Sequence, residues 1–178
     1  MLTLPAMTSH KRLKLRQCTN CECVINGVWE WVEECARAAA EEEPAMRGIL
    51  ADVCLSRNSL ATSISARLAR KLSRRDMPRE LIEPLIREAL AEDQNILSQI
   101  AQDLIAIVDR DPACRTPLEP LLFYKGFHAI TTYRISHWLW QHDRTIMALQ
   151  FQSLASEVFA VDIHPAATIG CGILLDHA

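Results

Sequence analysis

The spacing of apolar residues between about 28 and 110 constrains the fold of this 178-residue chain more than any other feature. Apolar positions recur there every three or four residues, which is the period of a helix that buries one face. One predicted helix has Asn58 as its N-cap and carries a stripe of four residues at i+4 spacing: Leu60, Ile64, Leu68 and Leu72. Because such stripes bury one another, the sequence predicts a mainly α fold with a multi-helix N-terminal domain.

Further helices are predicted on both sides of this one. The segment Val28 to Ala40 is helical by composition, and its tryptophans suit packing against another helix. Start and stop signals mark the remaining elements. They predict a helix opened by Asp76 and Pro78, with a candidate kink at Pro84, and a second helix capped by Asp93 and ended by Asp111-Pro112. After a loop over 112–120, they predict a helix from Phe123 and another from Thr145 to about Phe159.

Charge and composition exclude several classes of function. The chain has 19 Lys and Arg against 22 Asp and Glu, a net charge of −3, which argues against a general partner for nucleic acid or an anionic membrane. No apolar run approaches the roughly 20 residues that span a bilayer. Neither GxGxxG nor GxxxxGK[ST] occurs, so the sequence offers no phosphate loop for a kinase or a dehydrogenase.

Seven cysteines, an odd number, argue against a secreted disulfide framework and for a reducing compartment. Cys18, Cys21 and Cys23 form a CxxCxC cluster, but no second cysteine pair or histidine pair follows at zinc-finger spacing. We therefore predict no metal site, with a zinc-binding regulator as the weaker alternative. A cytoplasmic location is predicted. An organelle is the alternative, because residues 1–21 carry four basic and no acidic residues, as a transit peptide does.

The period of the apolar residues changes after Val161. Ile163, Ile169 and Leu175 are spaced by six, with small residues and glycine between them. An apolar residue at every sixth position is typical of hexapeptide repeats, in which a triangular β-helix turns a corner every six residues. Two steps of six are few, and an ordinary loop with short strands remains the alternative.

Aspartate and histidine gather near the C-terminus and suggest proton transfer. Asp162 and His177 are 15 residues apart, close to one coil of about 18 residues in a triangular β-helix, which would bring them together. A histidine oriented by a carboxylate is a suitable base for a hydroxyl group near neutral pH. Solvated terminal side chains are the alternative. For His128 and His137 we expect structural roles, with His137 a partly buried imidazole whose hydrogen bonds are satisfied.

Five runs of residues closely resemble the serine acetyltransferases of bacteria and plants. They stand in the order of that family and cover, with a looser match upstream to Val28, most of the chain. The runs are 110–113 (RDPA), 121–129 (LLFYKGFHA), 133–140 (YRI and HWLW), 161–167 (VDIHPAA) and 174–178 (LLDHA). The stretch 115–120 departs from the family pattern, which bears on the local shape around Asp111.

The resemblance implies acetyl transfer from acetyl-coenzyme A to the hydroxyl of L-serine, giving O-acetylserine for cysteine biosynthesis. It assigns His177 as the general base and Asp162 as the residue that orients it. It places Asp111 and Asp176 in contact with the amino acid. It also implies a left-handed parallel β-helix after the helical domain, no permanently bound cofactor, and acetyl-coenzyme A as co-substrate.

The resemblance also divides the chain into a leader (1–27), a helical domain (28–160) and the beginning of the β-helix (161–178). Members of the family continue through further coils that carry an Arg-His pair, the acetyl-coenzyme A groove and a tail that docks into cysteine synthase. The groove is thus expected beyond Ala178. The chain is interpreted as a fragment, a truncated product or a copy that has lost catalysis, inactive alone, with residues 163–178 frayed.

The family assembles as a dimer of trimers through its helical domains, so a homo-oligomer is expected. Two functions remain open for the chain at this point. One is the N-terminal part of a serine O-acetyltransferase. The other is a non-catalytic helical module that assembles with full-length subunits and modulates them.

Overall fold

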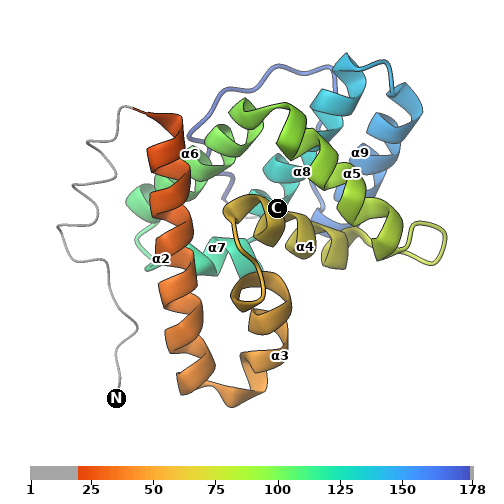
Figure 1. Cartoon of the computed structure of the whole chain (residues 1–178). Helices are drawn as coiled ribbons and strands as arrows, with labels where there is room; N and C mark the ends of the chain where they lie inside the picture. The colour runs from red at the N-terminus through yellow and green to blue at the C-terminus, as the bar shows by residue number, and fades with distance from the viewer. Residues whose placement is uncertain (1–19, 177–178) are drawn as a thin grey trace.

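The computed structural model describes residues 20–176, and helices form most of it (Figure 1). The predicted mainly α class is confirmed. The elements are α2 (Cys21–Glu42), η1 (Pro44–Met46), α3 (Arg47–Leu50), the π-helical turn η2 (Ala51–Leu55), α4 (Leu60–Leu72), α5 (Arg79–Glu92), α6 (Gln94–Arg110), α7 (Leu118–Phe123), α8 (Lys125–Gln141) and α9 (Thr145–Phe159).

Helix α8 is the central element of the fold. It is buried on most of its circumference, which is why it shows no single apolar stripe. Helix α9 lies against it, with the Ser136 hydroxyl donating to the Ala148 carbonyl oxygen at 2.7 Å and the His128 and Phe159 rings 5.4 Å apart. Figure 1 shows α2 on the opposite side of the molecule from this pair.

Several helix starts and ends follow the predicted signals, but α2 begins at Cys21 and not at Val28, and the helix predicted from Phe123 begins at Lys125, because Phe123 ends α7. Asp93 caps α6 as predicted, its carboxylate accepting from the Asn95 amide at 2.9 Å. The cap of α4 is Ser59 and not Asn58, because the Ser59 hydroxyl accepts from the Thr62 amide at 3.3 Å. Asn58 instead accepts a hydrogen bond from the Thr62 hydroxyl.

Three differences concern loops and prolines. The predicted loop over 112–120 is shorter, since α7 begins at Leu118. Helix α5 continues through Pro84, which lies in its second turn, so the hydrogen bond that proline lacks falls near the helix start. The short elements between 44 and 55 were not predicted, because none is long enough to show a helical period.

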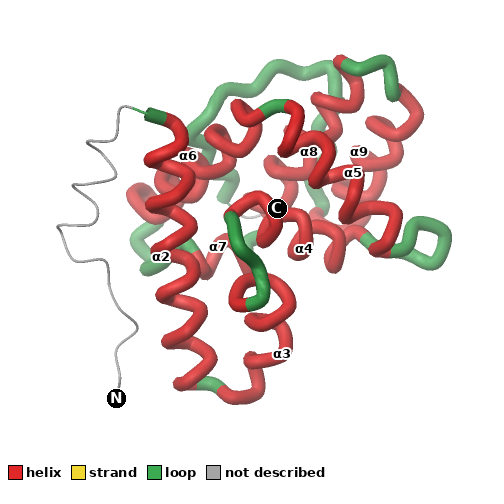
Figure 2. The backbone as a smooth tube through the Cα atoms, in the orientation of Figure 1, coloured by secondary structure: helices red, strands yellow, loops and turns green. Residues whose placement is uncertain are grey.

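Residues 161–176 form an extended segment that lies on the helices, and no part of it is a β-strand (Figure 2). The prediction that residues 163–178 fray is wrong for the described part, which side chains of α6 and α8 hold through hydrogen bonds. Ile163, Ile169 and Leu175, the predicted inward positions, are each half-buried. The helical domain thus supplies contacts that we had expected only from neighbouring β-helix coils.

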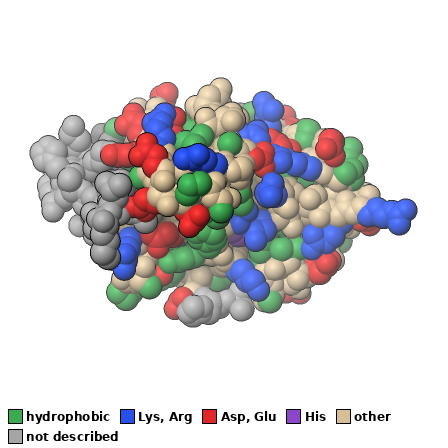
Figure 3. Space-filling view, turned by 90° about the horizontal axis from the view of Figure 1, so that it is seen from below, with side chains coloured by type: hydrophobic (Ala, Val, Ile, Leu, Met, Phe, Trp, Pro, Cys, Tyr) green, Lys and Arg blue, Asp and Glu red, His purple; other side chains and the backbone are tan. Residues whose placement is uncertain are grey.

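The surface carries mixed charge. On the face in Figure 3, acidic and basic side chains alternate with apolar ones, and neither sign gathers into one large patch. Among residues 20–176 no helix combines the length and the apolar character needed to cross a bilayer.

Candidate active site

Two of the predicted substrate residues line one pocket. Asp111 and Asp176 face a cavity of about 520 Å³ at the start of α8. Lys125 and Gly126, from the first turn of that helix, also line it. Asp111 and Asp176 are 65 positions apart in the sequence (176 − 111), so the fold brings together two carboxylates that only the family resemblance had linked.

Asp111 is fixed by the end of α6. It is the C-cap of that helix, and the proline that follows prevents the helix from continuing. Its side chain folds back and accepts from the Ala113 amide at 2.8 Å, while its carbonyl oxygen accepts from the Cys114 amide at 3.1 Å. This local turn holds the Asp111 carboxylate among the residues that line the pocket.

The chain that carries Asp176 passes very close to α8 at Gly126. A Cβ atom built on Gly126 would lie 2.9 Å from the carbonyl carbon of Leu175 and closer still to its oxygen. Only glycine therefore lets residues 174–176 approach the helix this closely. This close approach places Asp176 on the same pocket as Asp111.

Tyr124 lines the pocket, and the neighbouring Cys114 interacts with it. Burial, together with the neighbouring Cys114, raises the pKa of Tyr124. Burial and the nearby Glu119 raise the pKa of Cys114 to about 11. Both groups therefore stay protonated at neutral pH, and the charge that faces the pocket comes from Asp111, Asp176 and Lys125.

The predicted base and its orienting carboxylate are not seen together. His177 lies outside the described residues. Helix α9 ends at Phe159, and its C-cap residue Ala160 has a left-handed backbone conformation. Asp162 follows two residues later, and the Asp162 Oδ1 atom accepts from the Gln152 side-chain amide at 2.6 Å. Asp162 is not among the described residues that line the pocket. The pairing of Asp162 with His177 stays a prediction.

The other two histidines have structural environments. His137 is partly buried, and because a carbonyl oxygen can only accept, its Nδ1 donates to Pro165 at 2.6 Å. This confirms the predicted satisfied imidazole. His128 is buried, and its Nε2 donates to the Leu121 carbonyl oxygen at 2.8 Å.

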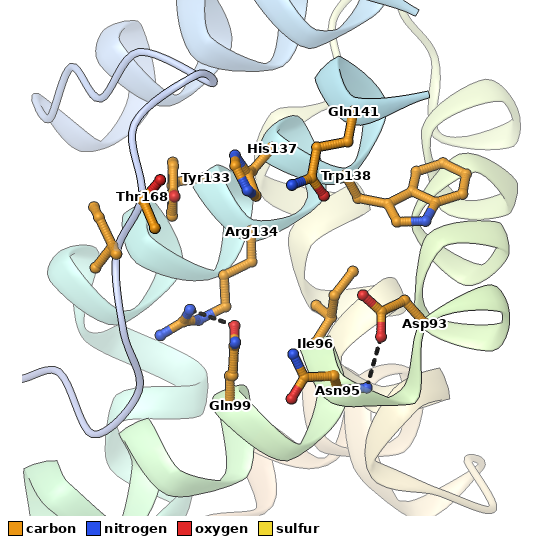
Figure 4. Close-up of a pocket in the computed structure, with 11 residues that line it drawn as sticks. Asp93, Asn95, Ile96, Gln99, Tyr133, Arg134, His137, Trp138, Gln141 and Thr168 are labelled. Atoms are coloured by element: carbon orange, nitrogen blue, oxygen red, sulfur yellow. Dashed lines mark hydrogen bonds between the residues drawn. The ribbon is translucent and has the colours of Figure 1, made fainter. Parts of the chain in front are cut away.

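A second, smaller cavity of about 170 Å³ lies between α6, α8 and residues 168–169 (Figure 4). Its polar side chains include Gln99, Arg134 and His137, and the Arg134 Nη1 atom donates to Gln99 at 2.6 Å. The sequence patterns did not single out Gln99 or Arg134 for a site, nor Lys125 and Gly126 for the first pocket. The only available signal was the presence of Lys125, Gly126 and Arg134 in the runs that carry the resemblance.

The predicted cysteine cluster is only partly visible. Cys18 lies outside the described residues, while Cys21 and Cys23 lie in the first turn of α2. In the range 20–176 no three side chains of His, Cys, Asp or Glu are placed to hold a metal ion.

Comparison with known families identifies the helical domain. Residues 28–132 match the family model for the N-terminal part of serine acetyltransferase. The chain belongs to the serine acetyltransferase family. The match covers 105 of the 178 residues (132 − 28 + 1), including Asp111 and the start of α8.

Serine acetyltransferases from distant organisms are similar to this chain. That of Escherichia coli K12 is 42% identical over 151 residues, which cover 85% of this chain and 55% of that protein. A probable serine acetyltransferase of rice, Oryza sativa subsp. japonica, is 44% identical over 152 residues, 85% of this chain and 48% of its own length. The chain thus spans about half the length of these relatives.

Solved serine acetyltransferases share the fold at similar identity. A structure in complex with CoA superposes with a TM-score of 0.85 at 40% identity, over 86% of this chain and 65% of that one. The soybean enzyme complexed with serine gives 0.85 at 41% identity, over 90% of this chain and 65% of its own.

Proposed function

We propose that this chain serves the acetylation of L-serine by acetyl-coenzyme A, as the N-terminal portion of a serine O-acetyltransferase. The observation that carries the proposal is the shared pocket of Asp111 and Asp176 in a chain of this family. Relatives whose structures contain CoA or serine support the same substrates.

The charges of the pocket suit a small zwitterion. The Asp111 and Asp176 carboxylates attract an ammonium group, and Lys125, which is the one basic side chain among the described lining residues, attracts a carboxylate. Such an arrangement would bind L-serine by its ammonium and carboxylate groups and leave its side-chain hydroxyl free to react.

His177 acts in this proposal as the general base. It takes the proton of the serine hydroxyl while the oxygen bonds to the acetyl carbonyl carbon, and the carbon–sulfur bond then breaks. The thiolate of coenzyme A takes this proton from the His177 imidazolium and leaves as the free thiol, which returns His177 to its neutral form. Asp162 orients the imidazole and stabilises its charged form. Groups that bind acetyl-coenzyme A are expected beyond Ala178.

Serine binding by the purified chain tests the proposal, with calorimetry for affinity and thiol release from acetyl-coenzyme A for transfer. We expect L-serine to bind, and Asp111→Asn and Asp176→Asn each to weaken binding at least tenfold, because each removes one charge-assisted hydrogen bond. Asp109→Asn, at the end of α6 and not among the described lining residues, is the matched control. Equal affinity in all four proteins would contradict the proposed site.

We further propose that the chain self-associates through α9. Ile146 is 82% exposed and Leu149 is 38% exposed, and they lie one turn apart on that helix. A second copy of the chain is the proposed partner, in line with the trimer-based hexamer that the resemblance implies. The variant Ile146→Glu is expected to reduce the mass measured by light scattering, whereas Leu81→Glu, on α5, is expected to leave it unchanged.

Two further proposals rest on the resemblance and on the composition. The first proposal is cysteine synthase as a partner, which the family resemblance implies. A cytoplasmic location, or an organellar one directed by the basic residues of 1–21, follows from composition. Expression of a fluorescent fusion with and without residues 1–21 separates the two locations.

A further inference from the structure

A buried ion pair lies between α6 and α8, below the extended segment. Asp103 is fully buried and Arg134 is 3% exposed. The Arg134 Nε and Nη2 atoms both donate to Asp103 Oδ2, at 2.9 and 2.7 Å. Figure 4 shows Arg134 reaching from α8 toward Gln99 of α6, beside the passing segment.

The pair also binds the backbone of the segment. Arg134 Nη2 donates to the Gly170 carbonyl oxygen at 2.8 Å, and the Ile173 amide donates to Asp103 Oδ1 at 2.8 Å. Arg110, at the end of α6, donates to the Gly172 carbonyl oxygen at 2.7 Å. Three successive points between residues 170 and 173 are therefore attached to helices and not to a neighbouring strand.

Burying two charges contributes little to stability by itself, because the cost of removing them from water offsets their attraction. Asp103 Oδ1 and Arg134 Nη2 nevertheless also bond a stretch of backbone that leads, three residues after Ile173, to Asp176. The contacts of the pair thus serve the path of the chain into the pocket.

We propose that Asp103 and Arg134 are positioning residues for the serine site: they fix residues 170–173 and thereby place Asp176 relative to Asp111. This inference rests on the proposed function for the meaning of the site. Neither residue touches the described lining of that pocket, so they act through the segment. Fixing the segment matters because a displacement of about 1 Å at a reacting group can lower a rate about 100-fold.

The test replaces both members of the pair by apolar residues of similar size, Asp103→Leu with Arg134→Met. Such replacements of buried ion pairs often preserve the fold, so we expect an unchanged helical circular dichroism spectrum. Hydrogen exchange followed by mass spectrometry or NMR should show the Ile173 amide exchanging at least tenfold faster, since its acceptor is gone. The affinity for L-serine should fall at least tenfold.

A matched control removes an ion pair elsewhere. Glu88→Leu with Arg144→Met deletes a pair with a donor–acceptor distance of 3.0 Å that does not touch the segment, and it should change neither readout. Arg134→Lys is the second test variant, to be used if the double variant fails to fold. It keeps a positive charge beside Asp103 but loses the planar fork that reaches Gly170 and Gln99 together.

The two readouts separate this inference from the function on which it rests. Unchanged exchange at Ile173 in the double variant, or unchanged affinity for L-serine in Arg134→Lys, overturns the positioning role. Faster exchange with unchanged serine affinity also overturns it. If the unaltered chain binds no L-serine, the proposed function fails, and the exchange data alone then decide whether the pair holds the segment.

Discussion

Gly126→Ala is expected to weaken L-serine binding by about 100-fold while leaving the helices intact. Alanine favours a helix over glycine by about 1 kcal/mol, so by propensity alone the change would stabilise α8. The added methyl group, however, would meet the backbone of Leu175, which cannot rotate out of the way as a side chain can. The segment must therefore move off the helix and carry Asp176 away from Asp111, a displacement of the size that costs about two orders of magnitude.

Gly48→Ala is the matched control, because Gly48 also lies in a helix and a Cβ atom there meets nothing within 4 Å. It should gain stability slightly and bind L-serine as the unaltered chain does. Calorimetry measures the affinity of both variants, and circular dichroism measures their helix content. Serine affinity that is the same for both variants would show that the close approach at Gly126 does not set the site.

Much of the helical domain could be predicted from the sequence, because its signals are local. The cap at Asp93, the stop at Asp111-Pro112 and the helix from Thr145 to Phe159 each depend on neighbouring residues, and the structure confirms them. The residue types alone did not decide whether Asn58 or Ser59 caps α4. Both residues are good caps, and only the geometry of the first turn separates them.

The candidate site also has a part that the sequence predicts and a part that it does not. The spacing of six near the C-terminus predicted a regular segment, yet its attachment to Asp103 and Arg134 depends on contacts that span 36 to 70 positions. No periodicity reports such contacts. In the single sequence, Asp103 resembles any acidic residue on a helix, and only its burial shows that it faces inward.

The free energy of unfolding is expected to fall by about 1.4 kcal/mol for each pH unit below 6.5, because of His128. Burial is the main cause that lowers the pKa of its imidazole to about 3; the Leu121 hydrogen bond opposes this shift, and the nearby Arg67 adds to it. A proton added at Nδ1 would find no hydrogen-bond acceptor among the described residues. The neutral ring is thus the form that the fold accepts.

The sign follows from which state binds the proton. Between pH 6.5 and about 3 the unfolded chain protonates this histidine and the folded chain does not, so acid favours unfolding. The contribution is fully present above pH 6.5 and is lost as the pH falls through this window. Asp52, whose pKa is lowered by its hydrogen bond with Arg79, adds a loss of its own only below about pH 4.

His128→Gln isolates this contribution from that of every other group. The glutamine amide can donate to the Leu121 carbonyl oxygen as Nε2 does, but it does not titrate near neutral pH. Urea unfolding at pH 7, 6 and 5 should give the unaltered chain a steeper loss of stability than the variant, and the difference between their slopes should approach 1.4 kcal/mol per pH unit at the acid end. His142→Gln, an exposed histidine at the end of α8, should keep the slope of the unaltered chain. Parallel curves for the unaltered chain and His128→Gln would mean that the folded protein accepts a proton at His128 without cost.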